Sequence, residues 1–175
     1  MSILTHVCLN AIYKYGNSTT KQILRNTYKF FNRYPIEELL LKDLISNSKG
    51  DIEIIKWTHM NGYIMKDIAC EYAAKYGYLN ILKWLHENGF PWDNLTCAYA
   101  TKYGHLDCLK YAHENGCPWN TWIFVTASYN GHLDCLKYAH ENGCPWDEKT
   151  CMYATESGHL DCLKYAHENG CEWNE

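Results

Sequence analysis

Residues 104–117 read Gly-His-Leu-Asp-Cys-Leu-Lys-Tyr-Ala-His-Glu-Asn-Gly-Cys, and the same fourteen residues return unchanged at 131–144 and at 158–171. The first glycines of these copies are 27 residues apart, and two earlier steps of 27 reach Gly77 and Gly50, which open degenerate copies. A strict period of this length is typical of stacked supersecondary units, none of which can bury its apolar face alone. The repeat therefore predicts a solenoid.

Each unit has the pattern of two helices joined by a turn. The buried side of the second helix is marked by Leu106, Cys108, Leu109 and Ala112. Gly116 can adopt the left-handed conformation that ends this helix, and Asn120 is placed to cap the next first helix. In the last unit that first helix is expected over Glu148 to Glu156, with Cys151 and Ala154 inside. We predict an all-α, helix-turn-helix solenoid without strands longer than two or three residues.

Residues 1–34 do not follow the period. Apolar residues recur at helical spacing from Ile3 to Tyr15 and again from about Thr19 to Phe31, and a Gly-Asn-Ser break separates the two segments. An irregular helical pair ahead of a regular array is typical of an N-terminal cap. We therefore expect a cap over residues 1–34 and five repeats over 35–175, in a single continuous solenoid.

Composition excludes several classes of protein. The chain has 175 residues, 47% of them hydrophobic and 15% aromatic, which is too many for a disordered protein. Its 16 basic and 20 acidic residues give a net charge of −4 and form no basic stripe, which argues against a nucleic-acid partner. The first residues have no basic region leading into an apolar run, so no signal peptide is expected, and no apolar stretch approaches the roughly 18–20 residues of a membrane span. We expect a soluble cytoplasmic protein.

Nine of the ten cysteines recur at fixed repeat positions, and Cys8 precedes the repeats. Equivalent residues of stacked helices lie about 8–10 Å apart, whereas a disulfide needs Cα atoms within about 7 Å. Within one unit, Cys108 and Cys117 are separated by a helix and lie farther apart still. We therefore predict small buried thiols in a reducing compartment rather than a disulfide framework.

The histidines and cysteines raise the question of chemistry. His113 and Cys117 are four residues apart, but Gly116 breaks the helix between them, and two ligands per unit fall short of the four of a structural zinc site. We expect the row of His113, His140 and His167 to pack between helices and to bond a neighbouring backbone. Every histidine and cysteine of the repeats recurs with the period, so the repeats offer no unique pair of nucleophile and base. The sequence also has no glycine-rich phosphate loop. No enzyme activity, metal or cofactor is expected.

The unit resembles the ankyrin repeat, over residues of about 37–175. Ala154-Thr155-Glu156-Ser157-Gly158-His159-Leu160-Asp161 followed by Gly170-Cys171 is similar to that family's Ala-Ala-x-x-Gly-His-Leu-Glu…Gly-Ala, and residues 143–147 are similar to its Gly-Ala-Asp-Val-Asn. The repeats are most similar to the short Gly-His-Leu-Asp-Cys-Leu-Lys repeats of giant DNA viruses. Ankyrin units run about 33 residues. The six residues missing here build the family's β-hairpin finger, so short loops are expected in its place.

The resemblance implies a function as well as a fold. Ankyrin proteins bind other proteins through a concave surface formed by the first helices, so we expect a protein partner and an adaptor role, directed at the host if the protein is viral. The resemblance also implies that His105, His132 and His159 make hydrogen bonds that fix the turn.

Differences among the units indicate where that partner would bind. The second helix is nearly constant, whereas the first helix varies at its end (75–76, 102–103, 129–130, 156–157) and at its start (67–68, 94–95, 121–122, 148–149). Recent duplication explains the likeness, but not why the differences concentrate in one helix. Packing between units is an alternative role for the aromatic residues. The predicted contact residues are Tyr76, Tyr103, Tyr129, Trp122, Lys75, Lys102, Asn130, Glu156, Asn94 and Glu148.

The last unit suggests a second function. Residues 158–171 repeat the internal helix unchanged, although terminal units of a solenoid usually have a polar outer face. The face around Cys162, Tyr165 and Ala166 is therefore expected to be partly apolar. A second copy, another partner or further repeats would each cover it. The alternative to an adaptor is a self-associating structural protein that stacks through this face as a homo-oligomer.

Overall fold

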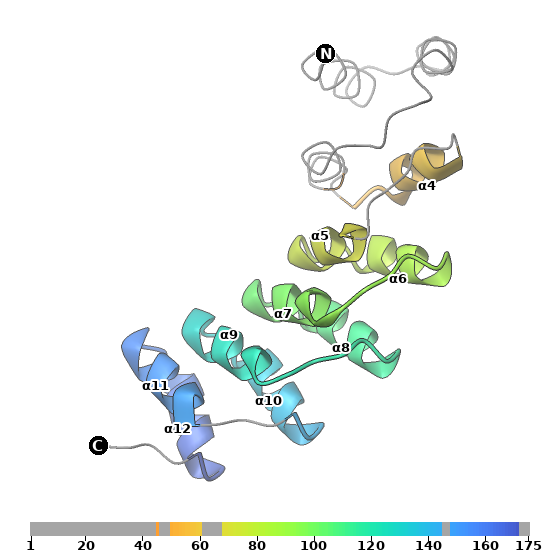
Figure 1. Ribbon diagram of the computed structural model, residues 1–175. Coiled ribbons are helices and arrows are strands. Elements are labelled where there is room, and N and C mark those ends of the chain that lie inside the picture. Colours follow the sequence, from red (N-terminus) through yellow and green to blue (C-terminus); the bar gives the residue numbers. More distant parts are fainter. Residues whose placement is uncertain (1–44, 46–49, 61–67, 145–147, 172–175) are drawn as a thin grey trace. The chain divides into compact units, whose positions relative to one another are not determined.

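The computed structural model describes residues 45, 50–60, 68–144 and 148–171, and all the regular structure in these residues is helical (Figure 1). This confirms the predicted all-α class. The chain divides into two compact units, Met1–Ala69 and Cys70–Glu175. The predicted cap over residues 1–34 and the start of the first repeat at Pro35 lie outside the described residues. No described helix is long and apolar enough to cross a membrane.

In the first unit, the described helix is α4 (Ile52–Met60). It follows Gly50, whose φ of 82° supplies the left-handed turn expected at this repeat position. Asp51 Oδ1 accepts a hydrogen bond from the Glu53 backbone N–H at 3.0 Å, which satisfies a donor of the first turn. Ile55 is fully buried, and so is Ile45 earlier in the chain.

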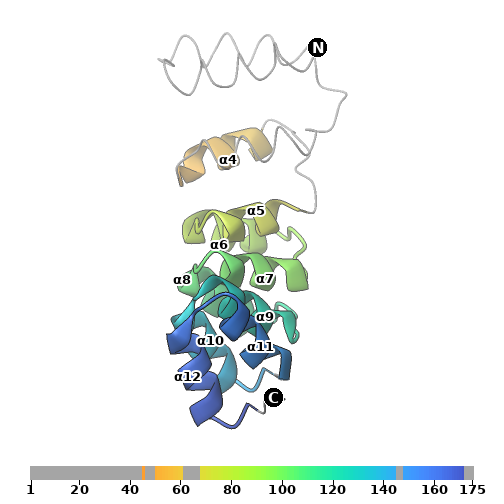
Figure 2. The same cartoon turned by 90° about the vertical axis from the view of Figure 1, so that its left-hand side faces the viewer.

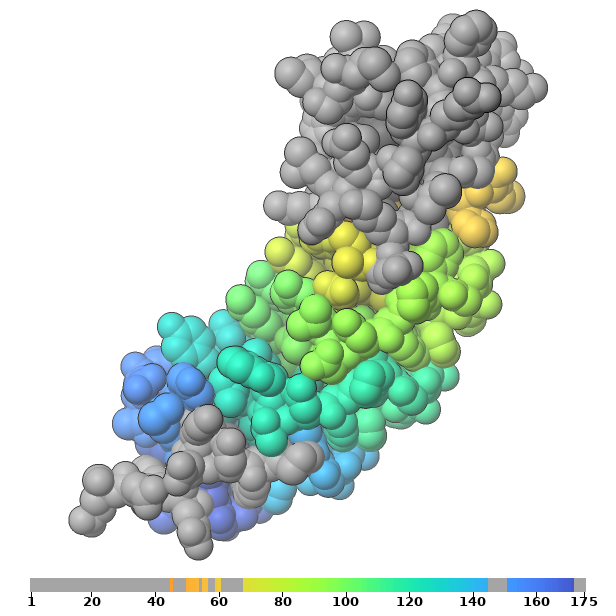
Figure 3. All heavy atoms as spheres, viewed as in Figure 1, coloured from red at the N-terminus to blue at the C-terminus, as the bar shows by residue number. Residues whose placement is uncertain are grey.

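The second unit consists of helix pairs that form two layers (Figures 1 and 2). The helix-one layer contains α5 (Ala69–Lys75), α7 (Asn94–Lys102), α9 (Trp122–Asn130) and α11 (Glu148–Glu156). The helix-two layer contains α6 (Leu79–Glu87), α8 (Leu106–Glu114), α10 (Leu133–Glu141) and α12 (Leu160–Glu168). Helix α9 packs against α7 and α11, and α10 packs against α8 and α12. Successive repeats appear as adjacent bands in Figure 3.

Turns and caps form as the residue pattern predicts. Gly104 has a φ of 73° between α7 and α8, and Gly116 has a φ of 82° after α8. Asp93 caps α7 by accepting a hydrogen bond from Leu95 N–H at 2.9 Å. Asn120 Oδ1 accepts from Trp122 N–H at 3.1 Å at the start of α9. Residues 115–121 contain no strand, so a short loop stands where an ankyrin unit has its finger.

Small side chains make up most of the core between the layers. Cys108, Leu109 and Ala112 of α8 are buried as predicted, but Leu106, the first residue of the helix, is only half-buried. Phe124 is fully buried in α9 at a position where other units have cysteine. Helix α11 has the predicted bounds, and its Cys151 and Ala154 are buried.

Candidate functional site

One row of histidines joins each repeat to the preceding one. His105 Nε2 donates to Lys75 O at 3.1 Å, and His132 Nε2 donates to Lys102 O at 3.0 Å. Because a carbonyl oxygen can only accept, Nε2 carries the proton in both rings. The rings also lie against the turn glycines of the preceding repeat. The structural role expected of these histidines is confirmed, but their acceptors belong to the preceding repeat rather than to their own turn.

A second row of histidines bonds in the other direction along the stack. Each Nδ1 lies 2.9–3.0 Å from a tyrosine hydroxyl of the following repeat, in the pairs His86–Tyr111, His113–Tyr138 and His140–Tyr165. His113 also stacks on Trp119 with 3.7 Å between ring centroids. The prediction that this row bonds backbone is therefore wrong for His113. Burial raises the pKa of each of the three tyrosines, because it disfavours the phenolate.

The thiols are buried and hydrogen-bonded rather than poised for reaction. No disulfide joins the described cysteines, all of which are buried as predicted. Cys117 Sγ donates to Asp93 O at 3.1 Å, and Cys144 Sγ donates to Asn120 O at 3.4 Å. A hydrogen bond with Cys117 and burial together raise the pKa of Cys97. A thiol held in its protonated form is a poor nucleophile, so these residues contribute packing.

The same buried arrangement bears on metal binding. Within the described ranges, no group of three or more histidine, cysteine, aspartate or glutamate side chains is arranged to hold a metal ion. His113 and Cys117, the pair that suggests a zinc site in the sequence, bond Tyr138 and Asp93 O instead. Both residues therefore join neighbouring elements of the stack.

Exposed apolar side chains gather on the helix-one layer. Leu95 is 44% exposed, Tyr103 40%, Trp122 60%, Tyr129 54% and Met152 44%. Among the described residues of the second unit, the one other exposed large hydrophobic side chain is Leu160, on α12. On α9, residues 122, 125 and 129 have the i, i+3, i+7 spacing of residues on one side of a helix. We call this surface, together with Lys75 and Lys102, the helix-one face.

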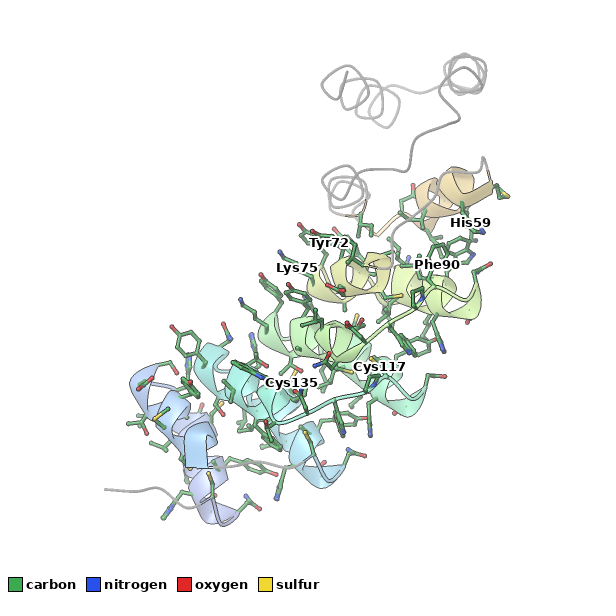
Figure 4. The ribbon with its side chains drawn as sticks, viewed as in Figure 1. His59, Tyr72, Lys75, Phe90, Cys117 and Cys135 are labelled. Carbon is green, nitrogen blue, oxygen red and sulfur yellow. The ribbon has the colours of Figure 1, made fainter. Side chains whose placement is uncertain are left out.

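A cluster of four tyrosines surrounds Lys75 at the α5 end of this face. Figure 4 shows Lys75 and Tyr72 on α5. Lys75 Nζ lies 5.4–6.0 Å from the ring centroids of Tyr72, Tyr76, Tyr99 and Tyr103. Lys102 Nζ lies 5.8 Å from the Tyr103 centroid. Ammonium groups at such distances are attracted by the electron-rich ring faces. The cluster joins α5 to α7 and fixes a positive charge among aromatic rings.

The predicted contact residues occupy different positions on this layer. Tyr103, Trp122, Tyr129, Lys102 and Glu156 are exposed. Tyr76, Lys75, Asn94 and Asn130 are half-buried, and the Glu148 side chain lies outside the description. Trp122 is 60% exposed, whereas its neighbour Phe124 is fully buried. Tyr129 contacts Tyr153 edge to face, with 6.3 Å between ring centroids.

Two residues of the face are absent from the predicted set. Leu95 follows Asn94 by one position and faces solvent, while Asn94 is half-buried at the start of α7. Met152 lies on the same side of α11 as Glu156. Leu95 and Met152 occupy the repeat positions of Trp122 and Val125, each 27 residues away, and this equivalence is the signal that could have revealed them.

Comparisons with known proteins agree with this architecture. Residues 97–175 match the family model described as ankyrin repeats (3 copies), and residues 70–113 match the model described as ankyrin repeats (many copies). Among solved structures, the chain is similar to the human ASB11 ankyrin repeat domain, with a TM-score of 0.63 and 18% sequence identity. That alignment covers 75% of this chain and 69% of the other. Comparison with curated protein sequences gives no significant match.

Proposed function

Because residues 70–175 belong to the ankyrin-repeat family, we propose that this chain is an adaptor that binds a partner protein through the helix-one face. Ankyrin repeats are protein–protein interaction modules, and this family is typically not enzymatic. The observation that carries the proposal is that five of the six exposed large hydrophobic side chains described in the second unit lie on one layer of the stack. An exposed patch of this kind on a soluble protein marks an interaction site.

The proposed contact residues follow from their chemistry and exposure. Trp122 and Tyr129 lie on the same side of α9 and have the two highest exposed fractions among the exposed aromatic side chains of the described residues. Tryptophan and tyrosine dominate binding hot spots, because they bury much area with few rotatable bonds. We place Trp122 and Tyr129 at the centre of the interface and Tyr103, Lys102 and Glu156 around them.

We predict that the double substitution Trp122→Ala/Tyr129→Ala weakens partner capture from cytoplasmic lysate by at least about 30-fold, a loss typical of two hot-spot residues. Both side chains are exposed, so the fold should be retained, which circular dichroism would verify. Leu160→Ala is the matched control, because it removes an exposed apolar side chain outside the helix-one layer. Equal capture by the double variant and the control would argue against this face.

The finer assignment rests on the resemblance of the repeats. Their likeness to the short repeats of giant DNA viruses supports a viral protein that acts on a host protein. The buried cysteines, with no disulfide among those described, suit the reducing cytoplasm. We propose the host cell cytoplasm as the place where the adaptor works.

A second candidate function is self-association through α12. Leu160 is 74% exposed, whereas its equivalents Leu106 and Leu133 are half-buried. A Cβ at Gly158 would meet no atom within 4 Å, whereas one at Gly131 would lie 2.5 Å from the His159 ring of the next repeat. The predicted apolar residues Cys162 and Ala166 are themselves buried, because they face inward, so Leu160 is the exposed member of this face.

This second candidate makes its own prediction. If the protein stacks through α12, Leu160→Glu will shift a concentration-dependent oligomer to monomer in light scattering, because a charge cannot be buried there without a partner. Leu95→Glu, an equally drastic change on the helix-one layer, should leave the oligomer intact. A wild-type protein that is monomeric at high concentration removes this candidate.

A further inference from the structure

We propose that the Lys75 end of the helix-one face recognises an acidic segment of the partner protein. The inference rests on the proposed adaptor function and specifies the chemistry of the partner. Its starting observation is the position of Lys75, whose ammonium is surrounded by four tyrosine rings at the junction of α5 and α7.

The tyrosines hold this charge without neutralising it. Among the described residues, no carboxylate pairs with Lys75 or Lys102. The ion pairs found in the described part of the chain, Lys56–Glu53 and Lys164–Glu168, lie on other helices. Glu71, one turn earlier on α5, is not within ion-pair distance of Lys75. The ring faces restrict the lysine side chain. Binding a ligand would therefore cost less lysine rotamer entropy than it would at an unrestrained lysine. The site is preorganised and positive.

The same geometry excludes a cationic ligand. An empty ring of tyrosines would recruit an ammonium group, but here the chain's own Lys75 occupies that position. A second cation would be repelled by Lys75 and by Lys102, the nearest ammonium on α7. A carboxylate would instead form charge-assisted hydrogen bonds with the lysine, and tyrosine hydroxyls supply further donors.

The negative ends of the helices do not cancel this charge. Lys75 and Lys102 lie in the last turns of α5 and α7, where unsatisfied carbonyls carry negative potential. In this stack the Lys75 and Lys102 carbonyls accept hydrogen bonds from His105 and His132. These bonds satisfy the Lys75 and Lys102 carbonyls and so weaken the negative potential beside the two ammonium groups.

The spacing of the repeats defines the partner segment further. Neighbouring helices of a layer are about 8–10 Å apart, and an extended peptide advances about 3.3 Å per residue. The apolar part of the face, at Trp122 and Tyr129, is on α9, one repeat beyond Lys102. The matching partner segment therefore has acidic residues about three to six positions from an aromatic or aliphatic residue.

The test compares two labelled peptides that differ only in charge. One carries a cluster of glutamates four residues from a Leu-Phe pair, and the other carries lysines in place of the glutamates. Binding to the full chain is measured by fluorescence polarisation at about 0.01 M and about 0.15 M salt, which differ in Debye length by about fourfold. We expect the glutamate peptide to bind at least about 10-fold more tightly, with affinity falling as salt rises.

Variants separate this inference from the adaptor function. Lys75→Met should weaken glutamate-peptide binding by about 10-fold, whereas Lys110→Met should not, although Lys110 Nζ also lies 5.7 Å from a tyrosine centroid, that of Tyr138. Undiminished binding by Lys75→Met, equal binding of the lysine peptide, or no glutamate-peptide binding overturns the inference. If Trp122→Ala/Tyr129→Ala still abolishes partner capture in that case, the adaptor function stands. If it does not, both fail.

Discussion

Gly104→Ala is expected to lower the free energy of unfolding by about 2–4 kcal/mol, whereas Gly116→Ala should cost about 1–2 kcal/mol. Both glycines have positive φ, 73° and 82°, so both substitutions incur left-handed backbone strain. They differ in what an added methyl group meets. At Gly104 the new Cβ would lie 2.6 Å from His132 Nδ1, and at Gly116 it would meet no atom within 4 Å.

The extra cost at Gly104 arises because His132 cannot move freely. Its Nε2 is bonded to Lys102 O at 3.0 Å, so displacing the ring breaks a hydrogen bond between repeats. Urea unfolding followed by circular dichroism measures both variants under the same conditions. Adding His132→Ala to Gly104→Ala should cost less than the two single substitutions together, because the clash is already gone. Equal destabilisation by Gly104→Ala and Gly116→Ala would show that the imidazole contact contributes nothing.

The histidine hydrogen bonds between repeats and the helix-one face share residues. The Lys75 carbonyl accepts a hydrogen bond from His105, and the Lys75 ammonium lies in the tyrosine cluster. Lys102 does the same with His132 and Tyr103. The contacts that hold successive repeats in register therefore also position the charged end of the face.

The repeat pattern predicts the backbone well, because turn chemistry is local. A glycine every 27 residues, an Asn-Gly stop and a capping Asp or Asn each act within a few residues of themselves. The bounds of α11 and the cap at Asp93 follow from these signals. The loop at 115–121 follows from the six residues that the unit lacks.

The side-chain partners are harder to predict, because they lie one repeat away. His113 bonds Tyr138, 25 residues later, and no spacing within a single unit indicates a hydroxyl rather than a backbone acceptor. Trp122 and Phe124 are two residues apart, yet one is 60% exposed and the other is fully buried. Which of the two side chains is buried depends on the orientation of α9 between α7 and α11. Periodicity gives the helix, and packing decides which apolar residues remain on its open side.

A steep loss of stability is expected as the pH rises above about 9. Burial raises the pKa of Cys108 and Cys135 to about 12 and that of Cys162 to about 11, whereas an exposed thiol titrates near about 8.5. Between these values the unfolded chain releases protons that the folded chain retains. Stability is therefore fully present below about pH 8.5 and falls as the pH rises, by up to about 1.4 kcal/mol per pH unit for each thiol.

Several buried thiols act together, so the effect is large against a total stability of about 5–15 kcal/mol. Cys70 and Cys151 also have pKa values raised to about 12, and that of Cys144 is raised to about 11. Unfolding free energies measured with reductant at intervals from pH 7.5 to 10.5 should fall throughout the upper half of that range. In Cys108→Ala/Cys135→Ala, the slope should decrease by about 2.7 kcal/mol per pH unit, because two titrating groups are removed. The substitutions also leave cavities, and the unfolding free energies at pH 7.5 measure the cost of these cavities. An unchanged slope of the unfolding free energy above that pH would therefore mean that these thiols already titrate normally in the folded protein.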